Sequence, residues 1–406
     1  MSGSQSNNPA TVSAEYCFIQ SPGELAACCE ELSSAERIAV DTEFVGEKTY
    51  YPRLEVIQLR GESGPPAIID VRAVGDLQPL AELLAGQGRL KIFHAAMQDV
   101  EILRRALGLL PLPLFDTQVA AALVGYGAQI SLTNLIRSVL GVDVSGRHTT
   151  SDWGHRPLSE GQLRYAALDV QHLHALHEAL IARLEERDRL YWYRDEQEQR
   201  LATAVTPGPA EPPEMLFRRV KDWASLRPRE LAVLRELTQW REETARSEDL
   251  PRRSVMTDET MVELARFHPD TREKARRLRR VHPGQVNRWF DTVRPVLERG
   301  LETPKEKWPQ KPVSERPDVP PGLMEICQAL VRTRSEEEQV APTIVATSAD
   351  IQQLIVNRHN LDEDRHAVLR GWRREVAGKQ LLDLLQGRLA VLIDPRTGGL
   401  RFKSAE

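Results

Sequence analysis

Four carboxylates in three short segments of this chain could hold metal ions: Asp41 and Glu43 in IAVDTEF, Asp99 in IFHAAMQDVEIL, and Asp169 in YAALDV. The apolar run 38–40 before the first pair predicts a buried strand, and side chains two residues apart on a strand share a face. Asp41 and Glu43 are therefore expected to lie side by side, where two negative charges resist ionising together. A bound divalent cation would remove that repulsion, and carboxylate oxygens favour hard ions such as Mg²⁺ or Mn²⁺. The alternative is that Asp41 caps a turn and Glu43 is solvated.

A tyrosine accompanies the third segment, because Tyr165 and Asp169 stand four residues apart in a pattern that predicts one long helix over residues 159–180. Residues at this spacing lie on one helical face, and a tyrosine hydroxyl beside a metal-ligating carboxylate can hold water or grip a phosphate oxygen. The alternative for Tyr165 is an amphipathic core residue. Asp99 is expected early in another helix, where its alternative role is to complement the helix dipole.

The elements that must position these side chains lie between residues 15 and 204, where strand and helix signals alternate. This alternation predicts an α/β domain. Its sheet is expected to be mixed, because the early strands follow one another too closely for helical crossovers. Strands are expected at 16–19, 38–44, 56–60, 67–70 and 90–93, and helices are expected to begin near residues 22, 77, 98, 116 and 132.

The three segments also resemble a known family. VDTEF, HAAMQD and YAALD resemble the exonuclease motifs of the DEDD superfamily, in the subclass with tyrosine in the third motif. FDTQVAAALVGYG from Phe115 and SDWGHRPLSEGQLRYAALDV from Ser151 resemble ribonuclease D more specifically. The resemblance implies a ribonuclease H-like sheet and a 3′–5′ exoribonuclease that trims the 3′ ends of precursor tRNA and other small RNAs. One departure is His94, where many members carry Asn; the ligand Asp99 is unaffected.

The resemblance implies a role for each residue of the site. Asp41, Glu43 and Asp169 would hold one divalent ion, and Asp41 and Asp99 would position a second, so two Mg²⁺ or Mn²⁺ ions are expected. Two such ions stabilise both the attacking and the departing oxygens of a phosphoryl displacement. Tyr165 would orient the attacking water, and the product would be a nucleoside 5′-monophosphate. The expected partner is the single-stranded 3′ end of RNA, and no obligate protein partner is evident.

A loop between the second and third motifs, VSGRHTTSDWGHRPLS, combines arginines with one indole. These side chains suit phosphate pairing and base stacking on a single strand, so Arg147, His148, Trp153 and Arg156 are predicted to bind substrate. The alternative is that Trp153 anchors the loop in the core while the arginines face water. A zinc site at His148 and His155 is not expected, because no further thiolate or imidazole stands at a suitable spacing.

Two proline-rich linkers, 205–212 and 301–322, divide the rest of the chain. Residues 213–300, with helical patterns at 228–243, 258–266, 271–281 and 284–297, resemble the HRDC domain, a small helical module found beside ribonuclease D and RecQ-type helicase cores. Residues 323–402 are also expected to be helical and to form a second, diverged HRDC-like domain; unrelated helices that pack on the first module are the alternative. The polar tail 1–14 is expected to be disordered.

Charge is distributed unevenly along the chain. The whole sequence has a formal net charge of −5, whereas residues 266–299 carry ten Lys or Arg against four Asp or Glu. The basic side chains between 272 and 280 are expected on one short helix, and Arg276, Arg277 and Arg280 are predicted to contact RNA phosphates. The alternative is a solvated helix face.

Composition is typical of an intracellular multidomain protein. The four cysteines show no paired ligand spacing, and Cys28 and Cys29 are adjacent, so reduced thiols are expected. No apolar segment is long enough to span a bilayer and no apolar N-terminal signal is evident, so a cytoplasmic location is expected. Two other functions remain open: a DNA-directed 3′–5′ exonuclease with the same carboxylates, and an inactive nucleic-acid-binding scaffold, which the presence of all four carboxylates and Tyr165 disfavours.

Overall fold

The computed structural model describes residues 16–144, 152–205, 212–311 and 319–405, which divide into two compact units. Met1–Phe44, Leu54–Leu201 and Val319–Glu406 make up the first unit. Val45–Arg53 and Ala202–Asp318 make up the second. The whole of the predicted tail 1–14 and most of the first linker lie outside the described residues. In the part of the chain that is described, no helix is both long and apolar enough to cross a membrane.

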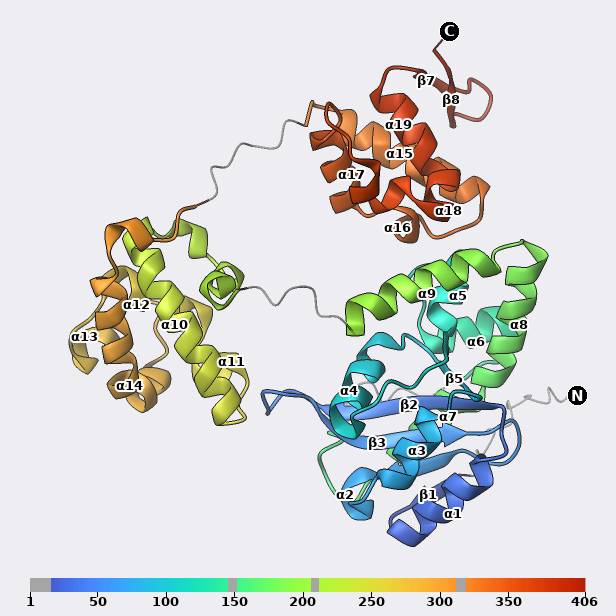
Figure 1. Cartoon of the computed structure of the whole chain (residues 1–406), viewed down its shortest axis with the longest axis horizontal. Helices are drawn as coiled ribbons and strands as arrows, with labels where there is room; N and C mark the ends of the chain where they lie inside the picture. Colours follow the sequence, from blue (N-terminus) through green and yellow to red (C-terminus); the bar gives the residue numbers. More distant parts are fainter. Residues whose placement is uncertain (1–15, 145–151, 206–211, 312–318, 406) are drawn as a thin grey trace, which may run out of the picture. The chain divides into compact units, whose positions relative to one another are not determined.

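A six-stranded sheet lies at the centre of the first unit, in the order β1-β4-β3-β2-β5-β6 (Figure 1). Strand β3 runs antiparallel to β4, whereas β1–β4, β2–β5 and β5–β6 are parallel pairs. The sheet is therefore mixed, which confirms the prediction from strand spacing. The short strand β6 was not predicted. The strands span Cys17–Ile19 (β1), Arg37–Val45 (β2), Arg53–Arg60 (β3), Ala67–Asp70 (β4), Leu90–Phe93 (β5) and Leu114–Asp116 (β6).

Side chains of β2 alternate between two apolar cores, one on each face of the sheet. Ile38 and Val40 join the core formed with α1, α3 and α4, whereas Ala39 joins the core formed with α5, α6, α7 and α8. The helix predicted over 159–180 is instead two helices, α7 and α8, which meet at His172. The helices span Pro22–Leu32 (α1), Val71–Val74 (α2), Gln78–Ala85 (α3), Met97–Leu107 (α4), Thr117–Leu123 (α5), Leu132–Leu140 (α6), Glu160–Gln171 (α7), Leu173–Glu186 (α8) and Leu190–Val205 (α9).

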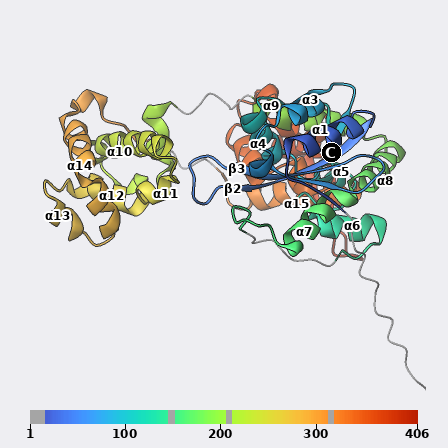
Figure 2. The same cartoon turned by 90° about the horizontal axis from the view of Figure 1, so that it is seen from below.

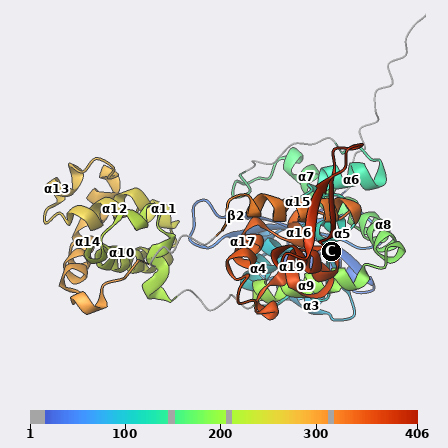
Figure 3. The ribbon, with the colours of Figure 1, turned by 90° about the horizontal axis from the view of Figure 1, so that it is seen from above.

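The C-terminal segment shares an apolar core with the sheet domain. The Trp372 ring stacks on that of Trp192 in α9, with centroids 4.9 Å apart, and the Ala341 amide donates to the Ala122 carbonyl at 2.9 Å. This segment was expected to be all helical, but it ends in an antiparallel ribbon, β7–β8. Its elements, grouped in Figure 3, are Leu323–Glu337 (α15), Pro342–Val345 (α16), Ser348–Val356 (α17), Gly371–Arg373 (α18), a π-helical turn Arg374–Gly378, Lys379–Leu385 (α19), Leu389–Ile393 (β7) and Leu400–Ser404 (β8).

The second unit is a helical bundle with its own core (Figure 2). Helices α10 and α14 pack so closely that a Cβ on Gly300 would stand 2.6 Å from the Val233 Cα, a contact that only glycine permits. The helix predicted over 271–281 is shorter, because α13 ends at Arg276. The α-helices of the unit span Pro228–Ser247 (α10), Arg252–Val255 (α11), Asp258–Phe267 (α12), Arg272–Arg276 (α13) and Pro283–Glu302 (α14).

Candidate active site

Three of the four carboxylates come together from β2 and α7. Asp41 and Glu43 continue the register of Ala39 along β2, so they face the side of the sheet on which Val170 of α7 is buried. One ligand oxygen from each of Asp41, Glu43 and Asp169 lies within 4.8 Å of the others. Oxygens at this separation can share one cation.

Asp99 lines the same pocket, although its helix, α4, packs on the opposite face of the sheet. It lies in the first turn of α4, is only 7% exposed, and accepts a hydrogen bond from the hydroxyl of Thr42, the residue between Asp41 and Glu43. Thr42 thus ties the helix that carries Asp99 to the strand that carries the first pair. The pocket has a volume of about 320 Å³ and is lined by Asp41, Thr42, Glu43, Phe44, His94, Ala95, Gln98, Asp99, Leu132, Tyr165 and Asp169.

Tyr165 lies one helical turn before Asp169, and the two side chains hydrogen-bond each other. Burial raises the pKa of the Tyr165 hydroxyl, and the charges of Asp169, Glu43 and Asp41 raise it further. The phenol therefore keeps its proton at neutral pH and can act as a hydrogen-bond donor.

The carboxyl groups of the pocket are hard to ionise. Burial is the main cause, and it raises the pKa of Glu43 to about 8 and those of Asp99 and Asp169 to about 7. The pKa of Asp41 is raised well above its usual range by burial and then by the charges of Asp169, Asp99 and Glu43. None of the lining residues is Lys or Arg. The donor set therefore fits divalent cations, whose charge would compensate the carboxylates.

Asp116 and Thr117 are part of this site's support, although the sequence analysis did not single them out. The Asp116 carboxylate, 1% exposed, accepts from the amides of Ala95 and Ala96 at 3.0 and 2.9 Å. The Thr117 hydroxyl lies 2.9 Å from His94 Nδ1. These contacts hold the turn between β5 and α4, and so place Asp99. The signal available in the sequence was an Asp directly before an apolar helix, which is typical of an N-cap.

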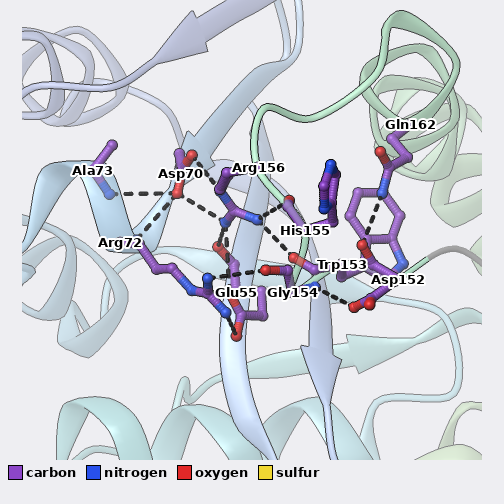
Figure 4. Close-up of polar contacts among 10 residues, drawn as sticks. All are labelled: Glu55, Asp70, Arg72, Ala73, Asp152, Trp153, Gly154, His155, Arg156 and Gln162. Carbon is purple, nitrogen blue, oxygen red and sulfur yellow. Dashed lines mark hydrogen bonds and ion pairs between the residues drawn. The ribbon is translucent and has the colours of Figure 1, made fainter.

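The loop before α7 is more buried than its composition suggested. Trp153 is 5% exposed, and its ring centroid lies 6.3 Å from that of Tyr165. This burial favours the alternative that Trp153 anchors the loop. The same alternative assumed that the arginines face water, but the guanidinium of Arg156 forms an ion pair with Asp70 (Figure 4). Direct RNA contact by Trp153 or Arg156 stays a prediction that this geometry does not support, and Arg147 and His148 lie outside the described residues.

Several basic side chains of the second unit are exposed, and some basic side chains form ion pairs. Arg280 pairs with Asp222 at 3.2 Å, and Arg272 pairs with Asp291 at 2.5 Å. Arg276 and Arg277 are exposed at the end of α13. The basic run therefore extends over a short helix and the turn after it, and Arg276 and Arg277 are exposed members of the run that form no ion pair with another described residue.

Comparisons with known proteins identify the family of the chain and two of its domains. Residues 16–185 match the family model described as 3′-5′ exonuclease, and residues 230–293 match the HRDC domain. The chain is 37% identical to ribonuclease D of Gluconacetobacter diazotrophicus over 93% of this chain and 94% of that protein. It is 35% identical to ribonuclease D of Nitrobacter hamburgensis, over 93% and 97% respectively.

Solved structures give the same result. The crystal structure of Escherichia coli RNase D superposes with a TM-score of 0.78 at 28% identity, over 92% of this chain and 99% of that one. The catalytic core of RRP6 from Trypanosoma brucei, at 22% identity and a TM-score of 0.62, covers 72% of this chain and 81% of its own, and shares the fold. On the identity and coverage of its curated relatives, the chain belongs to the ribonuclease D family of 3′–5′ exoribonucleases.

Proposed function

We propose that this enzyme trims the 3′ ends of precursor tRNA and other small structured RNAs and releases nucleoside 5′-monophosphates. The observation that carries the proposal is the convergence of Asp41, Glu43, Asp99 and Asp169 beside Tyr165 in one pocket without a basic residue in its lining. The E. coli relative is described as an exoribonuclease involved in structured RNA processing, which supports this class of substrate. We also propose a cytoplasmic location, the compartment in which the bacterial relatives named ribonuclease D would meet precursor tRNA.

Each carboxylate has a part in the proposed chemistry. Asp41, Glu43 and Asp169 would hold one Mg²⁺ or Mn²⁺ ion, and Asp41 and Asp99 would hold a second. When bound, two such ions would acidify a water molecule and neutralise charge at the reacting phosphate. The protein supplies the positions: β2 fixes Asp41 and Glu43, the Thr42 hydroxyl holds Asp99, and the Tyr165 hydroxyl holds Asp169.

Tyr165 would also orient the attacking water against the terminal phosphodiester. Its hydroxyl keeps its proton because burial and the nearby carboxylates raise its pKa. A protonated phenol can donate to a water or to a phosphate oxygen, but it cannot remove a proton. Tyr165→Phe is therefore expected to lower kcat, and it also removes the hydrogen bond to Asp169.

The second unit would hold the body of the RNA. Its HRDC match and the exposed Arg276 and Arg277 suit contacts to phosphates, which depend on charge and not on base sequence. We further propose the domain division 15–204, 213–300 and 323–402, in which the last domain packs on the first through a shared apolar core. Whether the last segment is a second HRDC-like domain stays a prediction, because the HRDC match covers residues 230–293.

The test is a time course with 3′-labelled and 5′-labelled versions of one tRNA precursor, beside a DNA oligomer with the same 3′ tail. We expect stepwise shortening from the 3′ end of the RNA, mononucleotide 5′-phosphates as products, and little action on DNA. Equal or faster attack on DNA would replace the proposal with a DNA-directed exonuclease. Binding of RNA without any release would indicate an inactive scaffold. Asp99→Asn is the inactive reference, and Glu101→Gln, an exposed change on the same helix, is its matched control.

A further inference from the structure

We propose that Arg156 is a positioning residue for Tyr165: held by Asp70 and Glu55, it fixes the turn 152–156 so that Trp153 supports the tyrosine beside the carboxylates. The inference rests on the proposed role of Tyr165 in the reacting site. It assigns to the loop before α7 a task that differs from direct RNA binding.

The guanidinium of Arg156 is held on one side by the sheet. Its Nε and Nη2 atoms donate to the two oxygens of Asp70, at 2.7 and 2.9 Å, in a bidentate pair (Figure 4). Nη2 also donates to the Glu55 carbonyl at 3.3 Å and lies 3.5 Å from the Glu55 carboxylate. Asp70 ends β4 and is 2% exposed, and Glu55 lies in β3 and is fully buried. Arg156 is thus attached to two strands of a rigid sheet.

The other side of the same guanidinium holds the loop. Arg156 Nη1 donates to the carbonyls of Trp153 at 2.6 Å and of His155 at 2.9 Å. Arg72 adds a second attachment, because its Nη1 donates to the Gly154 carbonyl at 2.9 Å while its Nε lies 2.6 Å from the Glu55 carboxylate. Two arginines therefore fix three consecutive carbonyls of the turn to residues of β3 and β4. Only a planar group with five donors can do this in the way that Arg156 does.

The fixed turn is coupled to the start of α7. The Asp152 carbonyl accepts from Gln162 Nε2 at 3.4 Å, and Gln162 is the capping-box residue that closes the N-terminus of this helix with Ser159. Trp153, buried by the turn, lies with its ring 6.3 Å from Tyr165, less than one turn after Gln162. The network therefore limits movement of the helix end that carries Tyr165, although none of its charged groups lines the pocket.

The network is balanced in charge. Two buried carboxylates, Glu55 and Asp70, face two guanidiniums, Arg72 and Arg156. Loss of one member would leave a buried charge without its partner and could unfold the chain. Arg156→Lys avoids this problem, because it keeps the positive charge and removes the planar fork.

The experiment measures kcat and KM on RNA with a single-stranded 3′ tail for Arg156→Lys, Tyr165→Phe and the double variant. We expect Arg156→Lys to fold, to keep KM within about twofold, and to lower kcat about tenfold, as a small misplacement of a reacting group does. In the Tyr165→Phe background the same change should lower kcat by less than about twofold, because the two residues act through one another. Arg164→Lys, exposed on α7 and paired with Glu160, is the matched control and should keep full activity.

Other outcomes would overturn the inference. A rise in KM with unchanged kcat would show that Arg156 binds RNA directly. A full tenfold loss in the Tyr165→Phe background would show that it acts without Tyr165. If Tyr165→Phe alone kept full kcat, the proposed role of Tyr165 would fall, and this inference with it. If Arg156→Lys did not fold, Trp153→Phe would replace it. Trp153→Phe should lower kcat about tenfold by itself and by less than about twofold in the Tyr165→Phe background.

Discussion

Two clusters of buried charge in the first unit differ in how the charge is balanced. In the pocket, Asp41, Glu43, Asp99 and Asp169 face one another with no Lys or Arg among the lining residues, and their pKa values are raised. In the network that holds the turn 152–156, Glu55 pairs with Arg72 and Asp70 pairs with Arg156. The first cluster needs a ligand to complete it, whereas the second is complete. Unbalanced charge therefore marks the place of chemistry, and balanced charge marks its support.

The largest expected effect comes from removing a ligand. Asp41→Asn should lower nucleotide release about 10³-fold, because metal ions contribute several kcal/mol to such reactions. The folded structure should persist, as circular dichroism would show. The corresponding change in the balanced cluster, Asp70→Asn, should lower kcat far less. A fully active Asp41→Asn variant in Mg²⁺ would refute the assignment of the site.

Stability should change in opposite directions in the two clusters. Asp70→Asn leaves Arg156 without its bidentate partner and should lower the free energy of unfolding by about 2 kcal/mol. This is less than the cost of breaking a fully buried ion pair, because Arg156 is partly exposed. Asp41→Asn removes a repelling charge and should raise the melting temperature in EDTA. Thermal unfolding of both variants in EDTA measures this difference. A fall in stability for both would remove the distinction between the clusters.

The pH dependence of stability should also identify the unbalanced cluster. Burial raises the pKa of Glu43 to about 8, so the folded chain binds a proton there more tightly than the unfolded chain does. Stability should therefore fall as the pH rises from about 4 to about 8. Between pH 5 and pH 8 in EDTA, the free energy of unfolding should fall more for the wild type than for Glu43→Gln. Added Mg²⁺ should stabilise the wild type more at pH 8 than at pH 5. Equal losses in the two proteins would contradict the prediction.

The smallest effect is expected in the second unit, where unpaired and paired basic side chains can be compared in the same way. Replacing exposed Arg276 or Arg277 by Gln should make the salt dependence of RNA binding less steep, by about 0.7 in log–log slope for each lost phosphate contact. Arg280→Gln is the control, because Arg280 pairs with Asp222 and should change the slope less. Filter binding at several salt concentrations provides the slopes. An unchanged slope for Arg276→Gln and Arg277→Gln would mean a solvated face.

The features that could be predicted from the sequence are those that depend on residues close together in the chain. The five expected strands, the mixed sheet and the starts of α1, α5 and α6 follow from local apolar patterns, and the motifs placed Asp41, Glu43, Asp99, Tyr165 and Asp169 in one pocket. Strand β6 was missed because its last residue, Asp116, is also the N-cap of α5, so the pattern there indicated the start of a helix. The break at His172 was missed because the apolar periodicity continues across it.

Contacts between distant residues could not be predicted in the same way. Arg156 forms an ion pair with Asp70, 86 residues earlier. Nothing in the local sequence indicates that this arginine binds another part of the fold and not a phosphate. The stacking of Trp192 on Trp372 likewise joins segments that are separate in sequence, so the C-terminal helices were not expected to share a core with the sheet domain. Burial and pairing, which are properties of the fold, distinguish the two roles.

The most direct test of this account is release of the 3′-terminal nucleotide from labelled RNA by the full chain, in Mg²⁺ and in EDTA, beside Asp41→Asn. We predict a labelled nucleoside 5′-monophosphate in Mg²⁺, none in EDTA, and release about 10³-fold slower from folded Asp41→Asn in Mg²⁺. Release in EDTA, or release by Asp41→Asn at the wild-type rate, would contradict the claim that the unbalanced carboxylates are the reacting site.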